Sequence, residues 1–136
     1  MMVSTKGRYA LRVMIDLAEH CKGGNIPMRE VAMRQGISLK YLERILPILV
    51  SARLVEGVHG KKGGYCLTRD PSEYTVGEIL RLTEGGIAPV SCLGYDAPSC
   101  ERQTACRTLP MWKELQERID DYVDHVTLAD LMVEEA

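Results

Sequence analysis

In the first half of the chain, apolar and polar positions alternate with a helical period. Between residues 5 and 20 apolar side chains recur every three or four positions, which predicts an amphipathic helix. A glycine pair ends this pattern, and a short helix is expected over 28–35. Behind a further glycine turn, Ser38 is the expected N-cap of a helix over 39–54, which Pro47 should kink. The two helices and the turn predict a helix-turn-helix.

After this helix, apolar and polar residues alternate in two short runs, which flank a segment rich in glycine and lysine. We expect strands over 54–58 and 65–68, joined by the tip 59–64, with Pro71 ending the second strand. A hairpin that follows a helix-turn-helix is the wing of a winged helix, and the tip of such a wing commonly lies along DNA. The sequence therefore predicts a mainly α fold with a small β-hairpin wing.

The second half contains two more helical patterns separated by an irregular stretch. A helix over 76–84 is expected to begin at a capping box made by Thr75 and Glu78. Residues 87–108 show no hydrophobic period, and a long helix is expected from Pro110 onwards. A last short helix should follow.

An apolar seam runs along the long helix, with spacings of three, four, three and four residues. Its members are Trp112, Leu115, Ile119, Tyr122 and Val126. A seam of this kind can form a third core layer of the same domain, or it can pair with a second copy of the chain. Because the rest of this helix is dense in charged residues, the pattern favours a homodimer.

Composition and charge indicate the size of the core and the kind of partner that the chain could bind. A chain of 136 residues with 46% hydrophobic residues can bury the core of one modest domain. Residues 1–70 carry 12 basic and 6 acidic side chains, whereas 71–136 carry 5 and 13. This asymmetry indicates a basic surface for a polyanion, or two solvated faces that happen to differ. With no long apolar run and no signal-peptide pattern, a cytoplasmic location without a membrane partner is expected.

The second helix of the helix-turn-helix carries polar side chains on its outer face. We expect Leu39, Leu42, Ile45 and Leu46 to face inward and the polar face to meet DNA. Arg44 suits guanine, whereas Glu43 is repelled by phosphate and should select among bases. The alternative is a core helix with an ordinary charged exterior. The candidate DNA-binding residues here and in the wing are Ser38, Lys40, Tyr41, Glu43, Arg44, His59, Lys61 and Lys62.

Three of the five cysteines fall within the irregular stretch, at Cys92, Cys100 and Cys106. Clustered thiolates in a loop bind a soft metal or act in redox chemistry, so an iron–sulfur cluster, a thiol switch and a zinc site all remain open. Cys21 and Cys66 are expected to be small buried residues, and an odd number of cysteines does not suit a disulfide framework. No pattern of an enzyme active site is present in the sequence.

Several stretches resemble the IscR/NsrR/CymR family of winged-helix transcription regulators. They are "TKGRYALRVMIDLA", "ISLKYLERIL", "GVHGKKGGYCL", "TVGEILRLTEG", "MWKELQERI" and "VTLADL", together with the three-cysteine loop. The start of the chain and the second helix are most similar to the IscR branch. The resemblance implies a homodimer that binds a two-fold symmetric DNA operator and holds a [2Fe-2S] or [4Fe-4S] cluster.

The resemblance also implies roles for particular residues. Cys92, Cys100 and Cys106 match the cluster ligands of the family, and His59 and Gly60 match contacts to the DNA minor groove. Leu109 stands where the IscR branch has a histidine ligand, and Arg8 stands where the NsrR branch has an acidic one. Candidates for the fourth ligand are Glu101, Asp96, Glu114, a side chain of a partner subunit, or a small molecule.

These inferences give three expected parts: a winged-helix DNA-binding domain over 1–86, a cluster-binding loop over 87–108, and a dimerisation helix with a C-terminal tail over 109–136. The expected function is transcription regulation in response to iron–sulfur or redox status, without enzymatic activity. A cluster-free regulator that acts through a thiol switch or a protein partner is the alternative. A zinc-stapled interaction module without a DNA role would need the basic wing to be incidental.

Overall fold

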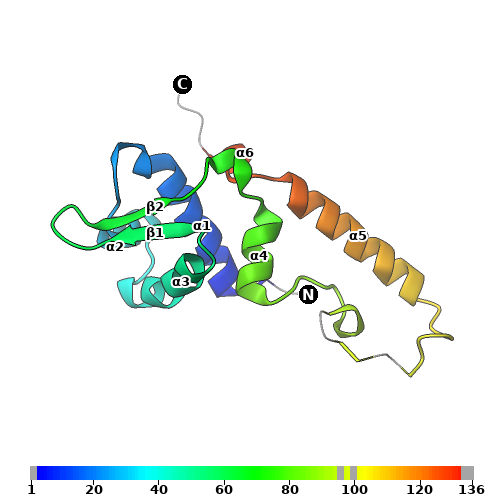
Figure 1. Cartoon of the computed structure of the whole chain (residues 1–136). Helices are drawn as coiled ribbons and strands as arrows, with labels where there is room; N and C mark the ends of the chain where they lie inside the picture. The colour runs from blue at the N-terminus through cyan, green and yellow to red at the C-terminus, as the bar shows by residue number, and fades with distance from the viewer. Residues whose placement is uncertain (1–2, 95–96, 99–100, 133–136) are drawn as a thin grey trace.

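The computed structural model describes residues 3–94, 97–98 and 101–132 and is mainly helical (Figure 1). Its elements, in chain order, are α1 (Thr5–His20), the 3₁₀ turn η1 (Cys21–Gly23), α2 (Met28–Gln35), α3 (Leu39–Ser51), β1 (Val55–Val58), β2 (Gly64–Leu67), η2 (Pro71–Glu73), α4 (Val76–Glu84), η3 (Ser91–Leu93), α5 (Leu109–His125) and α6 (Leu128–Leu131). No helix among the described residues is both long and apolar enough to cross a bilayer.

Helix α1 forms the centre of the core. Its apolar face, represented by Val13, Met14 and Leu17, is completely buried, and it contacts α2, α4, α6 and β2. Asp16 on the same helix is also fully buried, and it accepts hydrogen bonds from Arg34 at 2.8 and 3.0 Å and from Gln35 at 2.9 Å. These bonds compensate the cost of burying a carboxylate and fix α2 against α1.

Helices α2 and α3 and the hairpin form the predicted winged helix. Gly36 takes the left-handed conformation that the turn requires, and Pro47 is accommodated inside α3, which continues to Ser51. The strands pair antiparallel, with Val55 opposite Leu67. They lie within one residue of the predicted ranges.

The wing is held to the rest of the domain at its second strand. Tyr65 exchanges two backbone hydrogen bonds with Ile26, each 2.9 Å long. Gly64 beside it has a φ of +146°, and a β-carbon there would collide with the backbone of Ile26 and Pro27. A glycine is therefore required where the wing meets the segment before α2.

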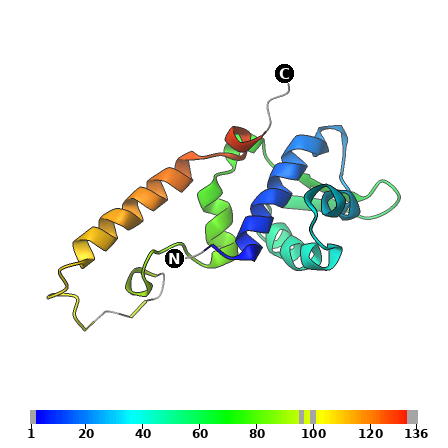
Figure 2. The same ribbon diagram turned by 180° about the vertical axis from the view of Figure 1, so that it is seen from behind.

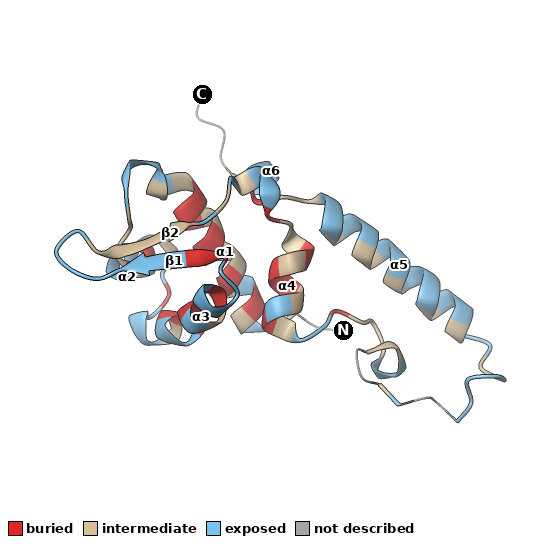
Figure 3. Ribbon diagram, in the orientation of Figure 1, coloured by how far each residue is buried: buried red, intermediate tan, exposed pale blue. Residues whose placement is uncertain are grey.

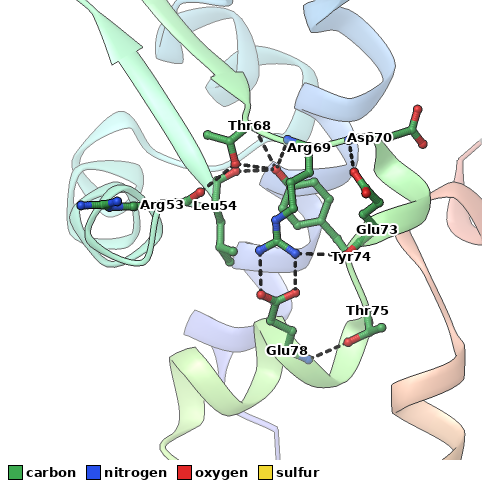
Figure 4. A network of polar contacts seen from close by, with 9 residues as sticks. All are labelled: Arg53, Leu54, Thr68, Arg69, Asp70, Glu73, Tyr74, Thr75 and Glu78. Carbon is green, nitrogen blue, oxygen red and sulfur yellow. Dashed lines mark hydrogen bonds and ion pairs between the residues drawn. The ribbon is translucent and has the colours of Figure 1, made fainter.

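A buried tyrosine connects the base of the wing to α4 (Figure 4). The Tyr74 hydroxyl donates to the Leu54 carbonyl at 2.7 Å and accepts from the amides of Thr68 and Arg69 at 2.9 and 3.0 Å. The Arg69 guanidinium lies over the Tyr74 ring and pairs with Glu78 at 2.7 Å. The predicted capping box is therefore only half correct: Thr75 caps α4, but the Glu78 carboxylate binds Arg69 instead of the cap backbone.

Helix α5 lies apart from the core, as both views of the ribbon show (Figures 1 and 2). None of its residues is buried (Figure 3). It is tied to α4 by Arg81, which donates to Asp120 at 2.8 Å and to Asp124 at 2.5 and 3.1 Å. Leu128 of α6 then returns to the core, where it is fully buried.

Candidate nucleic-acid interface and cysteine loop

Helix α3 presents the polar face that the sequence predicts. Ser38 caps the helix by accepting a hydrogen bond from the Tyr41 amide at 3.1 Å, and its backbone has the extended conformation of an N-cap. Lys40, Glu43 and Arg44 are exposed, whereas Leu42, Ile45 and Leu46 are buried. The prediction for Leu39 was wrong: it is 44% exposed, although Leu42 one turn further along α3 is completely buried.

Tyr41 has a packing role as well as a surface one. It is half-buried, and its ring meets the edge of the Tyr9 ring at 5.2 Å between centroids. Arg12 lies over Tyr9 at 5.2 Å. This contact orients α3 against α1, so only part of the Tyr41 side chain is available to a ligand.

The wing tip is open to solvent. His59, Gly60, Lys61 and Lys62 are all exposed, and Gly60 has a φ of +115° that supports the tight turn. Within the described part of the chain, no ion pair involves Lys40, Arg44 or the two tip lysines. These four cations are therefore free to meet phosphate groups.

The cysteine loop lies at the other end of the molecule, beside the start of α5 (Figure 1). Cys92 is exposed in η3, and Cys106 is half-buried just before α5. Both line one hollow of about 200 Å³, together with Leu93, Pro98, Leu109 and Lys113. Cys100 lies outside the described residues, and so does Asp96.

The surroundings of the Cys106 thiol favour its ionised form. The Thr108 hydroxyl lies 3.4 Å from its sulfur, and this hydrogen bond, with those from the backbone of Thr108 and Leu109, lowers the pKa of Cys106 below its ordinary value. Arg102 adds a favourable charge. Because the thiolate is the metal-binding and nucleophilic form, this environment suits a soft-metal ligand or a reactive thiol.

A fourth protein ligand does not emerge from the described residues. Leu109 lines the hollow but has no ligating atom, and the Glu114 carboxylate binds Arg118 at 3.1 Å. Glu101 is exposed, and Arg8 bonds Thr5 at 3.4 Å. Across the described ranges, no group of three histidine, cysteine or acidic residues is placed to hold a metal ion.

The apolar seam of α5 stays largely uncovered by this chain. Leu115 is 39% and Tyr122 is 71% exposed, while Trp112, Ile119 and Val126 are half-buried. The alternative of a third core layer therefore does not describe this helix within one chain, because none of its residues is buried.

Two cysteines outside the loop behave differently from the prediction. Cys21 in η1 and Cys66 in β2 are half-buried rather than buried, and their sulfur atoms lie at bonding distance. The pattern of the sequence could not reveal this pair, because 45 residues separate its members.

The residues that join α5, α4 and the wing were also not predicted from the sequence. Arg81 holds α5, and Glu78 on the same short helix pairs with Arg69 at the base of the wing. The only signal for these contacts was the i, i+4 spacing of Asp120 and Asp124, which puts two carboxylates on one face of α5.

A helix-turn-helix followed by a basic hairpin defines this chain as a winged-helix protein of the transcription-regulator class. The sequence model of the Rrf2 family, described as iron-dependent transcriptional regulators, matches residues 3–134, and the chain belongs to this family. Its members and relatives are transcriptional regulators and not enzymes.

Individual relatives agree with this assignment. The HTH-type transcriptional regulator IscR of Aliivibrio salmonicida is 37% identical over 134 residues, which are 98% of this chain and 79% of the relative. The structure of T. potens IscR is 35% identical with a TM-score of 0.75, covering 96% of this chain and 85% of that one. The structure of CymR, the global cysteine regulator of B. subtilis, is 34% identical with a TM-score of 0.79, covering 96% and 95%.

Proposed function

We propose that this chain is a homodimeric, IscR-like regulator that binds an iron–sulfur cluster through Cys92, Cys100 and Cys106. The observation that carries the proposal is the shared hollow of Cys92 and Cys106, where the pKa of one thiol is lowered, in a family described as iron-dependent. These thiolates would hold the cluster, [2Fe-2S] or [4Fe-4S], and the cluster would supply redox-active iron.

The DNA-contacting surface in this proposal has two parts. Arg44 and Glu43 of α3 read base edges in the major groove, while Ser38, Lys40 and Tyr41 contact phosphate. His59, Gly60, Lys61 and Lys62 of the wing tip follow the minor groove and the backbone. The exposure of these cations and the absence of ion pairs to them within the described chain support this assignment.

The dimer in this proposal forms along α5. A second copy would cover the seam of Trp112, Leu115, Ile119, Tyr122 and Val126, and its symmetry would present two reading helices to a two-fold operator. The exposed apolar seam supports this arrangement. The proposed parts are a DNA-binding domain over 1–86, the cluster loop over 87–108 and the dimer helix with its tail over 109–136, acting in the cytoplasm.

The proposed coupling uses the contacts of α4. When the three cysteines are held together, the start of α5 is fixed, and Arg81 transmits the position of α5 to α4. The ion pair between Glu78 and Arg69 then connects α4 to the base of the wing. The spacing of the two reading helices would then differ between loaded and apo protein.

The experiment uses DNA duplexes selected from a random-sequence pool, with loaded and apo protein compared in separate selections. We expect different affinities of the two forms for at least one duplex. Arg44→Ala should weaken specific binding roughly 5- to 100-fold and relax one base position, whereas Arg118→Ala on exposed α5 should have little effect. Equal affinities of both forms for every selected duplex would contradict the proposal.

A cluster-free regulator is the second candidate, because the B. subtilis CymR structure is as similar as the IscR one. In that case the loop thiols would respond to oxidants, or a protein partner would bind. A Cys21→Ser protein free of iron whose DNA affinity still changes with peroxide, and which no iron supply alters, would favour the loop thiols of this candidate.

A further inference from the structure

We propose that Cys21 and Cys66 are a second, reversible redox site, separate from the cysteine loop, whose disulfide clamps the wing to the end of α1. The α-carbons of the pair lie 5.4 Å apart, within the range of protein disulfides. The pair needs no rearrangement of the backbone to be linked.

The surroundings of the pair favour reaction. Both side chains are half-buried, so a small oxidant can reach them. The Leu67 amide points at the Cys21 sulfur from 3.5 Å, and a donor at that position stabilises a thiolate. Cys21 is therefore the attacking thiol in this proposal, and Cys66 is the resolving one.

Hydrogen peroxide would oxidise the pair in two steps. The Cys21 thiolate attacks one peroxide oxygen, the O–O bond breaks, and a sulfenic acid forms while water leaves with one added proton. The Cys66 thiolate then attacks the Cys21 sulfur, the S–O bond breaks, and the departing hydroxide takes up a proton and leaves as a second water. Two thiols are oxidised and one hydrogen peroxide is reduced, and a dithiol reductant reverses the link by exchange.

The position of Cys21 and Cys66 determines which elements a disulfide between them would restrict. The 45-residue separation encloses α2, α3, β1 and the wing tip in one covalent loop. Cys66 is next to Tyr65, whose two backbone bonds to Ile26 are the other attachment of the wing to this segment. The disulfide thus restricts the elements that the proposed function assigns to DNA.

The effect on DNA rests on that proposed function, whereas the effect on the wing does not. Oxidation should slow hydrogen exchange of the wing amides over 55–67 several-fold and raise the thermal midpoint by roughly 5–10 °C. Because a wing that is already ordered loses less entropy on binding, the oxidised protein should bind a selected duplex roughly 3- to 10-fold more tightly.

The test uses the full chain in which Cys92, Cys100 and Cys106 are replaced by serine, so that Cys21 and Cys66 are the remaining thiols. The protein is oxidised with hydrogen peroxide, and a portion is then reduced with dithiothreitol. The oxidised and the reduced protein are each examined by peptide mapping and by hydrogen exchange. Their binding to a duplex selected with reduced wild type is measured as well. The matched control adds Cys21→Ser, which should abolish every difference between the states. In Cys66→Ser protein, Cys21 should be trapped as a sulfenic acid by dimedone.

Peptides linked through Cys21 and Cys66, with slower exchange in the wing, would support the site. Absence of the linked peptide, or a link that leaves wing exchange unchanged, would overturn it. If no duplex can be selected with reduced wild type while the link and the exchange effect are present in the three-serine variant, the proposed DNA-binding function fails and the redox site stands.

Discussion

Removing a single oxygen atom tests how the wing is held to α4. Tyr74 is completely buried, and its hydroxyl is the hydrogen-bond partner of the Leu54 carbonyl and of two amides, from Thr68 and Arg69. Tyr74→Phe keeps the ring and its packing but leaves these three backbone groups without that partner.

The expected cost follows from the burial of each group. An unsatisfied buried polar group costs about 1–3 kcal/mol. The Leu54 carbonyl is buried but still accepts a longer hydrogen bond from the Thr68 amide at 3.4 Å, so it should contribute less than a full share. Thr68 is exposed and Arg69 is half-buried, so their amides can turn to water at a smaller cost. The total should be about 1–3 kcal/mol, which for a chain of 136 residues lowers the thermal midpoint by roughly 3–10 °C.

Urea and thermal unfolding, at one protein concentration and with reductant present, provide the assay. Tyr41→Phe is the matched control, because Tyr41 is half-buried and its hydroxyl makes no hydrogen bond within the described residues, so stability should change by less than about 0.5 kcal/mol. A Tyr74→Phe protein as stable as this control would refute the view that the hydroxyl secures the wing.

Three further substitutions test other contacts. Gly64→Ala should cost about 2 kcal/mol or more in urea unfolding, because the residue has a φ of +146° and its β-carbon would meet backbone atoms. Asp16→Ala should cost about 1.5–3 kcal/mol in the same assay, because it removes the charge-assisted hydrogen bonds that the buried Asp16 carboxylate accepts from Arg34 and Gln35. Thr108→Val should raise the pKa of Cys106 toward its usual value, so that the pH profile of its alkylation by iodoacetamide moves to higher pH.

Controls for these three use similar changes at sites without the contact. Gly23→Ala meets nothing within 4 Å and should leave stability nearly unchanged. Asp121→Ala removes a carboxylate that is 80% exposed and should have little effect on unfolding. The alkylation of Cys92 in the Thr108→Val protein should keep its original pH profile. Equal responses of variant and control would contradict the corresponding assignment.

Much of the fold was predictable because its signals are local. Ser38, Thr75 and Thr127 each accept a hydrogen bond from an amide three residues ahead, as N-caps do, and Gly36 and Gly85 end helices in the left-handed conformation. Such signals depend on the identity of neighbouring residues, so sequence alone is sufficient to read them.

The contacts that join the elements could not be read in this way. Tyr74 meets a carbonyl 20 residues away, and Arg81 meets carboxylates 39 and 43 residues away. The capping box at Thr75 failed for the same reason, because a distant arginine competes for Glu78. In the candidate site, the cysteine spacing identified the loop, but the hollow between Cys92 and Cys106 depends on how the loop folds against α5.

Whether the loop cysteines bind an iron–sulfur cluster can be decided by anaerobic reconstitution of wild type and of Cys92→Ala. An absorption spectrum and analysis of iron and acid-labile sulfide then follow for both proteins. We expect a coloured wild type that contains both iron and sulfide, and a Cys92→Ala protein that has lost them. A colourless wild type without iron after reconstitution would contradict this expectation.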